Sequence, residues 1–242
     1  MVNILPYSLE TCSLYEKKII KNTPIVIFFD HNMALPVWGN YASKINTPLE
    51  LISFDYHADT HDPFATKIGI HDFEQEEFEK NILSKINYHI DNYCFEDVYK
   101  LSCEYVANDE HILTAYKLGY INSYHIFCEL PNNEIESYQW WDRRRGLNAS
   151  YHARHSIKYL TYEELEKISI TPFVLDFDLD YFSTPRVFDD LFVDKISFLI
   201  KKATVITIAR EPKYFELEKT DTHFENNQAL ELLLRIIQKA LE

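Results

Sequence analysis

Carboxylate and imidazole side chains gather at three places along this chain, each directly after a short run of apolar residues. They are Asp30-His31 after residues 25–29, then Asp55, His57 and Asp59 after residues 51–54, and finally Asp176, Asp178 and Asp180 after residues 173–175. Charged groups at the end of a buried strand are costly to desolvate unless something compensates them. A pair of divalent cations would do so, and the sequence therefore predicts a two-metal site.

The spacing within these clusters also favours a shared metal site. Side chains at every second position lie on one face of a strand, and they can converge where the strand turns into a loop. Carboxylates with one or two imidazoles suit a hard or borderline ion such as Mn²⁺. Two such ions about 3.5 Å apart polarise a shared water into hydroxide. The alternative is that each Asp-x-Asp repeat is a solvated turn, which explains one repeat but not three clusters after apolar runs.

Apolar runs and amphipathic segments alternate along the chain, and this alternation is typical of α/β folds with a parallel sheet. We expect strands at residues 25–30, 50–55, 122–128, 156–160, 172–178 and 203–209. We expect helices at residues 73–90, 108–118, 161–168, 187–202 and 224–241. Residues 131–155, which include Trp140-Trp141 and three consecutive arginines, are interpreted as a long loop or lid. Ligands of such sheets bind at the carboxyl ends of the strands, where all three clusters fall.

Length and composition limit the class of protein. The chain has 242 residues, 46% of them hydrophobic, and we expect one domain over residues 1–242. Only 4 glycines are present, and no phosphate-binding glycine-rich motif is found. Four cysteines without CxxC spacing predict reduced thiols in a cytoplasmic protein. The sequence shows no signal peptide, and no apolar run approaches the roughly 20 residues of a membrane span.

The net charge of −14 bears on the kind of partner. It argues against nucleic acid, because phosphates would be repelled. It is compatible with a cationic substrate, although acidity by itself also serves solubility.

The three clusters together resemble the motifs of the arginase/ureohydrolase superfamily. Residues 55–59 resemble its D-A-H-x-D motif, residues 30–31 the end of its G-G-D-H motif, and residues 177–180 part of its S-F-D-x-D motif. The motifs follow in the same order along the chain. Within the superfamily the chain is most similar to the UPF0489 group, which includes peptide arginases of ribosomal-peptide maturation. The resemblance implies an arginase/deacetylase-like fold, a three-layer α/β arrangement around a central, mostly parallel sheet.

The resemblance also implies two Mn²⁺ ions per chain and six protein ligands. The first ion would be bound by His31, Asp55, Asp59 and Asp178, and the second by His57, Asp55, Asp178 and Asp180. In this scheme Asp59 accepts a hydrogen bond from the bridging hydroxide and passes its proton to the leaving amine.

Two further residues take catalytic roles by the same resemblance. His71 resembles the loop histidine that shuttles protons, although an ordinary surface histidine explains it equally well. Glu211 follows the apolar run 203–209 and resembles the carboxylate that pairs with the substrate guanidinium. A planar guanidinium is best held bidentately by a carboxylate. The alternative for Glu211 is a surface residue before Pro212.

The chain departs from the family motifs at several positions. Phe28-Phe29 replace two glycines, and Asp176 replaces a serine, so we leave Asp176 outside the metal site. His61 stands where arginases of free arginine carry an asparagine that binds the α-carboxylate. This favours a substrate without free α groups, such as an arginine within a peptide. If the polar segment 108–111 faces the cleft, Asp109 would contact such a cationic peptide, helix capping by Asn108 being the simpler explanation.

The predicted activity is Mn²⁺-dependent hydrolysis of the guanidino group of arginine in a precursor peptide, giving ornithine and urea. One alternative is a ureohydrolase or amidohydrolase acting on a small free substrate such as arginine, an agmatine-like compound or an acyl-amine. The other is a non-catalytic, metal-stabilised binding module. Two bound ions per chain would favour the predicted activity over both. The oligomeric state stays open, a homo-oligomer included.

Overall fold

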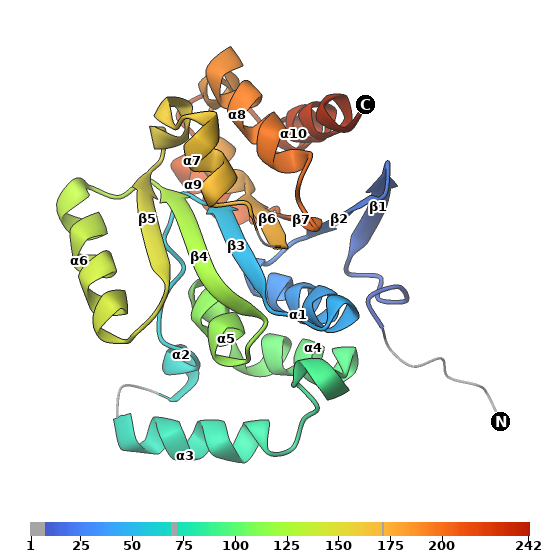
Figure 1. Ribbon diagram of the computed structural model, residues 1–242, viewed down its shortest axis with the longest axis vertical. Coiled ribbons are helices and arrows are strands. Elements are labelled where there is room, and N and C mark those ends of the chain that lie inside the picture. Colours follow the sequence, from blue (N-terminus) through green and yellow to red (C-terminus); the bar gives the residue numbers. More distant parts are fainter. Residues whose placement is uncertain (1–7, 69–71, 171) are drawn as a thin grey trace.

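One mixed β-sheet organises the residues that the computed structural model describes, which are 8–68, 72–170 and 172–242. Within them the strand order is β1-β2-β7-β6-β3-β4-β5, and β1 runs antiparallel to β2 while the other neighbours are parallel (Figure 1). The strands are β1 Glu16–Ile20, β2 Thr23–Phe28, β3 Leu49–Phe54, β4 Ile121–Cys128, β5 Ala149–Ala153, β6 Phe173–Asp178 and β7 Val205–Ala209.

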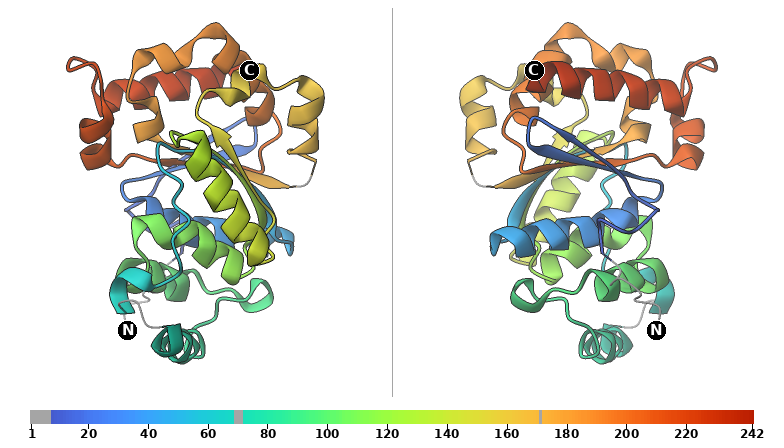
Figure 2. Two further views of the ribbon diagram at one scale, coloured as in Figure 1. Left: turned by 90° about the vertical axis from the view of Figure 1, so that its left-hand side faces the viewer. Right: turned by 90° about the vertical axis from the view of Figure 1, so that its right-hand side faces the viewer.

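Helices cover both faces of this sheet and make three layers (Figures 1 and 2). One face is covered by α1 Ala34–Ile45, α4 Phe95–Tyr105 and α5 His111–Lys117, and the other by α7 Tyr162–Lys167, α8 Asp190–Ile200, α9 Pro212–Glu218 and α10 Asn226–Leu241. The remaining helices are α2 Ala65–Ile68, α3 Asp72–Leu83 and α6 Asn132–Arg144. The expected α/β fold with a central, mostly parallel sheet is confirmed.

The central strands are apolar on both faces because helices cover both. In β2, Ile25 and Ile27 pack toward α8 and α10, while Val26 and Phe28 pack toward α1. A strand buried on two sides reads as a continuous run of Val, Ile and Phe, and this is why the central strands could be located from sequence. A capping box begins α7, since Thr161 Oγ1 accepts from the Glu164 amide at 3.2 Å and Glu164 accepts in return from the Thr161 amide at 2.7 Å.

Two segments differ from the sequence-based expectation. Residues 156–160, predicted as a strand, form a 3₁₀ turn at Ser156–Tyr159, and the strand is β5 just before it. Residues 131–155, predicted as a loop, contain α6 and β5. Their patterns were weak because α6 buries few apolar side chains and β5 lies at the sheet edge. The prediction also lacked β1, α1 and α4.

A pair of histidines on neighbouring strands should make stability depend on pH. His125 of β4 lies with its Nδ1 3.4 Å from Nε2 of His152 in β5. Burial, together with the charge that His152 would carry, lowers the pKa of His125 to about 4. In the unfolded chain His125 binds a proton near pH 6.5, whereas in the folded chain it stays neutral until about pH 4. The stability present above pH 6.5 is therefore lost as the pH falls toward 4.

We expect the free energy of unfolding to fall by roughly 3 kcal/mol between pH 6.5 and 4 because His125 is protonated more readily in the unfolded chain. Urea denaturation across that pH range would measure it, and His125→Gln should flatten the dependence. The exposed His223 supplies a matched control, because His223→Gln should leave the slope unchanged. An unchanged slope in His125→Gln would contradict this assignment.

In the described part of the chain, no helix combines the length and apolar character that crossing a membrane requires.

Candidate metal centre and active site

Four neighbouring strands bring the predicted site residues to one edge of the sheet. In the order β2-β7-β6-β3 these strands are adjacent and parallel, so their carboxyl ends lie together. His31 follows β2, Asp55 follows β3, Asp178 ends β6, and Glu211 follows β7. Residues that are far apart in the sequence therefore meet because of the strand order.

His31 is the centre of the first group of ligand atoms. Its Nδ1 lies 3.3 Å from Asp55 Oδ2, 3.2 Å from Asp59 Oδ2 and 3.1 Å from Asp178 Oδ2. The side chain of His31 is fully buried, and those of Asp55 and Asp178 are almost so. These are the four residues expected to share one ion, and the structure brings them together.

His57 belongs to a second group on the solvent side of the first. Its Nδ1 lies 3.0 Å from Asp180 Oδ2 and 3.8 Å from Asp55 Oδ1. The side chain of His57 is 43% exposed, whereas that of Asp180 is buried. The close contact with Asp180 is the main cause that raises the pKa of His57, to about 9. Asp55 thus has one oxygen near each histidine, as a carboxylate shared between two ions requires.

Several ligand atoms are buried without a hydrogen bond. Within the described ranges, His31 Nδ1, Asp55 Oδ2 and Asp180 Oδ2 have charged neighbours at short range but no partner in hydrogen-bond geometry. Buried polar atoms normally have partners, and unsatisfied ones call for an explanation such as an ion. Oxygen and imidazole donors of this kind fit divalent cations.

The electrostatics of the site are consistent with bound cations. Burial, with the charges of neighbouring carboxylates, raises the pKa of Asp55 and of Asp178 well above the usual range. Burial opposes protonation of His31, but Asp176 and the other carboxylates outweigh it and raise the pKa of this histidine well above its usual value. All three directions reflect an excess of buried negative charge, which divalent cations would neutralise.

Two site residues have left-handed backbone conformations. Asp59 has φ 49° and Glu211 has φ 35°, a region that residues other than glycine seldom adopt. Such conformations cost on the order of 1–3 kcal/mol and cluster at functional sites. In both residues the turn follows a strand end and directs the carboxylate toward the cavity described next.

A cavity of about 520 Å³ opens beside the metal ligands and is lined by His57, Ala58, Asp59, His61, Thr66, Ala107, Asn108, Asp109, Leu130, Tyr138, Glu211 and Tyr214. Glu211 is 6% exposed there. Its Oε1 accepts from the His31 amide at 3.0 Å and from Asn108 Nδ2. Burial raises the pKa of Glu211 to about 7. Glu211 is therefore fixed at the cavity wall, not on the open surface as the alternative held.

His61 and Asp109 form another part of the wall. His61 Nδ1 lies 2.8 Å from Asp109 Oδ2, and the His61 amide donates to the Asp109 carbonyl at 2.8 Å. The segment 108–111 therefore faces the cleft. Capping by Asn108 was the wrong explanation, because Asn108 binds Glu211, and Glu110 accepts from the amide of Ala107 at 3.0 Å.

His71, the predicted proton shuttle, lies outside the described residues.

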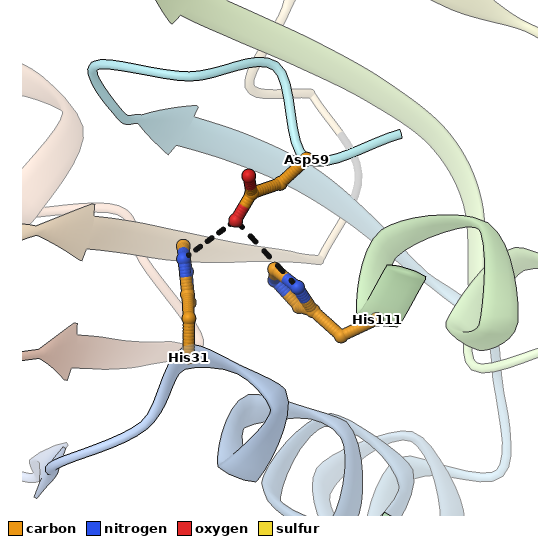
Figure 3. A group of neighbouring side chains, drawn as sticks. All are labelled: His31, Asp59 and His111. Carbon is orange, nitrogen blue, oxygen red and sulfur yellow. Dashed lines mark ion pairs between the residues drawn. The ribbon is translucent and has the colours of Figure 1, made fainter. Parts of the chain in front are cut away.

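Sequence reasoning did not place His111 at the centre. The side chain is fully buried at the start of α5, with its Nδ1 3.9 Å from Asp59 Oδ2. Figure 3 shows His31 and His111 approaching Asp59 from two different elements. The ring centroids of His31 and His111 are 4.1 Å apart. A histidine in an ordinary helical pattern gave no signal of this position in the sequence.

Comparisons with known proteins bear on the sequence near the start of the chain and on the fold. Residues 6–72 match the model of the Arginase family. No curated protein matches the sequence. Among solved structures, proclavaminate amidino hydrolase from Streptomyces clavuligerus matches with a TM-score of 0.50 and 12% identity, over 90% of this chain and 63% of that one. The chain thus spans less than two thirds of that enzyme. It is similar to the arginase family in the sequence of residues 6–72, and to an amidino hydrolase in its fold.

Proposed function

We propose that this protein hydrolyses the guanidino group of an arginine residue within a peptide, giving an ornithine residue and urea. The observation that carries the proposal is a cluster of two histidines and four aspartates beside a cavity that His57, Asp59 and Glu211 line. A separate carboxylate next to such a ligand set suits a cationic, planar substrate group.

In this proposal the ligand set holds two cations, and its oxygen-rich chemistry favours Mn²⁺. His31, Asp55, Asp59 and Asp178 would hold one and His57, Asp55, Asp178 and Asp180 the other. When bound, the cations supply Lewis acidity that makes water a better nucleophile near neutral pH.

The protein residues orient the substrate and move the proton. Glu211 pairs with the guanidinium and presents its carbon to the water. The water oxygen bonds to that carbon, and Asp59, which lines the cavity, accepts the proton. The bond between the guanidinium carbon and Nε of the arginine then breaks, and Asp59 returns the proton to this nitrogen, which leaves as the amine of ornithine.

Two features support a peptide over a free amino acid. His61 stands at the family position of the asparagine that binds the α-carboxylate of free arginine, and here its Nδ1 lies 2.8 Å from Asp109 Oδ2. A second cavity of about 220 Å³, bordered by Trp141 and Arg145, shares His61 and Tyr138 with the first. The second cavity adjoins the first, and in this proposal it receives the residues that flank the target arginine.

The setting in which the enzyme would act follows from composition and thiol chemistry. None of the four cysteines, all of which lie in the described residues, is joined in a disulfide, which supports a reducing compartment, and we propose the cytoplasm. The net charge of −14 would attract an arginine-bearing precursor peptide and repel nucleic acid.

The proposal is tested by incubating the Mn²⁺-loaded protein with arginine-containing peptides and measuring their mass. Each hydrolysed arginine should lose about 42 Da, because CN₂H₂ leaves a side chain that is otherwise always charged. The same peptides with lysine in place of arginine are the control and should keep their mass. Urea from free arginine without any loss from peptides would overturn the peptide preference. No hydrolysis of either would overturn the activity.

A further inference from the structure

Asp176 is a fully buried carboxylate directly beneath the proposed metal centre. It lies in β6, and the strand register places it between Ser53 of β3 and Thr207 of β7. Thr207 Oγ1 donates to its Oδ1 at 2.6 Å, and Ser53 Oγ donates to its Oδ2 at 3.0 Å. Each oxygen is therefore held from a neighbouring strand, and the carboxylate is fixed in orientation.

The third donor to Asp176 is His31. Its Nε2 lies 2.9 Å from Asp176 Oδ2. For Nδ1 to bind a cation its lone pair must be available, so Nε2 must carry the proton of the imidazole and donate it to Asp176. The lone pair is then on Nδ1, the atom that lies within 3.3 Å of Asp55, Asp59 and Asp178.

We propose that Asp176 is a positioning residue that fixes the tautomer and ring orientation of His31 and strengthens its binding to a divalent cation. The inference rests on the metal centre of the proposed function and adds a residue outside the six ligands. A carboxylate behind a ligating imidazole raises its basicity, and removing such a partner typically weakens metal binding about 10- to 100-fold. The serine of the family motif carries no such charge.

A purely structural role would give different results. Asp176 also ties β3 and β7 to β6, so its loss could lower stability without touching the metal. Ser53→Ala is the matched control, because it deletes a donor to the same oxygen and leaves the contact between His31 and Asp176 in place. The thermal midpoints of the metal-free proteins would measure the structural part separately.

The experiment titrates wild type, Asp176→Asn, Asp176→Ser and Ser53→Ala with Mn²⁺, following affinity by calorimetry and ion pairing by electron paramagnetic resonance. Both Asp176 variants should bind the first-site ion about 10- to 100-fold more weakly. At a Mn²⁺ concentration that saturates wild type, the resonance spectra of both Asp176 variants should show an isolated ion instead of a coupled pair. Ser53→Ala should keep the wild-type affinity and the coupled signal.

Asp176 variants that bind two Mn²⁺ as tightly as wild type would overturn the proposal, whatever their thermal midpoints. A wild type that binds no Mn²⁺ would overturn both this inference and the metal centre. The measurement needs no substrate. A wild type that binds two ions but hydrolyses no guanidino compound would contradict only the proposed function, and the weaker binding of Asp176→Asn would still support the role of Asp176.

Discussion

Asp178→Asn is expected to abolish turnover and to reduce the bound Mn²⁺ from two ions per chain to one or none. Asp178 is the carboxylate proposed to bridge the ions, with Oδ2 3.1 Å from His31 Nδ1 and Oδ1 accepting from the Asp180 amide at 3.1 Å. Asparagine preserves the shape but removes the charge that offsets two dications in a buried site. Loss of metal-derived transition-state stabilisation of several kcal/mol corresponds to a fall in kcat of roughly three orders of magnitude.

Metal content by mass spectrometry and turnover of an arginine peptide would be measured on the same sample. Asp194→Asn is the control, since it makes the same chemical change at an exposed position on α8. It should retain two ions and wild-type turnover. If Asp178→Asn did the same, the assignment of the metal centre would be wrong.

Glu211→Gln should separate substrate binding from metal binding. The neutral amide cannot form the charged pair with a guanidinium, and hydrogen bonds to charged groups contribute about 1.5–3 kcal/mol. We therefore expect kcat/KM for an arginine peptide to fall by about 10- to 100-fold while two Mn²⁺ ions remain bound. Steady-state kinetics with a parallel metal analysis would test both parts.

Glu216→Gln offers a close comparison for Glu211. Glu216 is exposed on α9, one turn beyond the cavity wall, and pairs with Lys219 at 2.7 Å. Its substitution should leave kcat/KM near the wild-type value. Equal losses in the two variants would point to a general effect of lowered charge, and an unchanged Glu211→Gln would remove Glu211 from substrate recognition.

The fold and the clustering of the proposed metal ligands could be predicted because their signals are local. Strands β2, β3, β6 and β7 are rich in apolar residues, and the proposed site residues end these strands or follow them within a few positions. Adjacent parallel strands bring their carboxyl ends together, so a pattern along the chain became a cluster in space. The boundaries of α6 and β5 were not predictable in this way, because one has a narrow apolar face and the other lies at an edge.

The parts of the site that sequence could not supply depend on contacts between distant segments. His111 reaches Asp59 from α5, and Asn108 binds Glu211 from the turn before it. The sequence shows Asp176 in place of the serine of the family motif, but the contact of Asp176 with His31 depends on the strand register. Local patterns carry no information about such pairings.

The order of strands in the sheet also bears on how the chain folds. β2 pairs with β7 and β3 with β6, so elements from the first quarter of the sequence join elements from its last third. Closing such long loops costs chain entropy before any stabilising contact forms. Pairings of this kind therefore form slowly. The proposed ligands are divided between the same two regions of the chain. A complete metal centre can therefore assemble only after these long-range pairings, and high-affinity Mn²⁺ uptake would mark a late stage of folding.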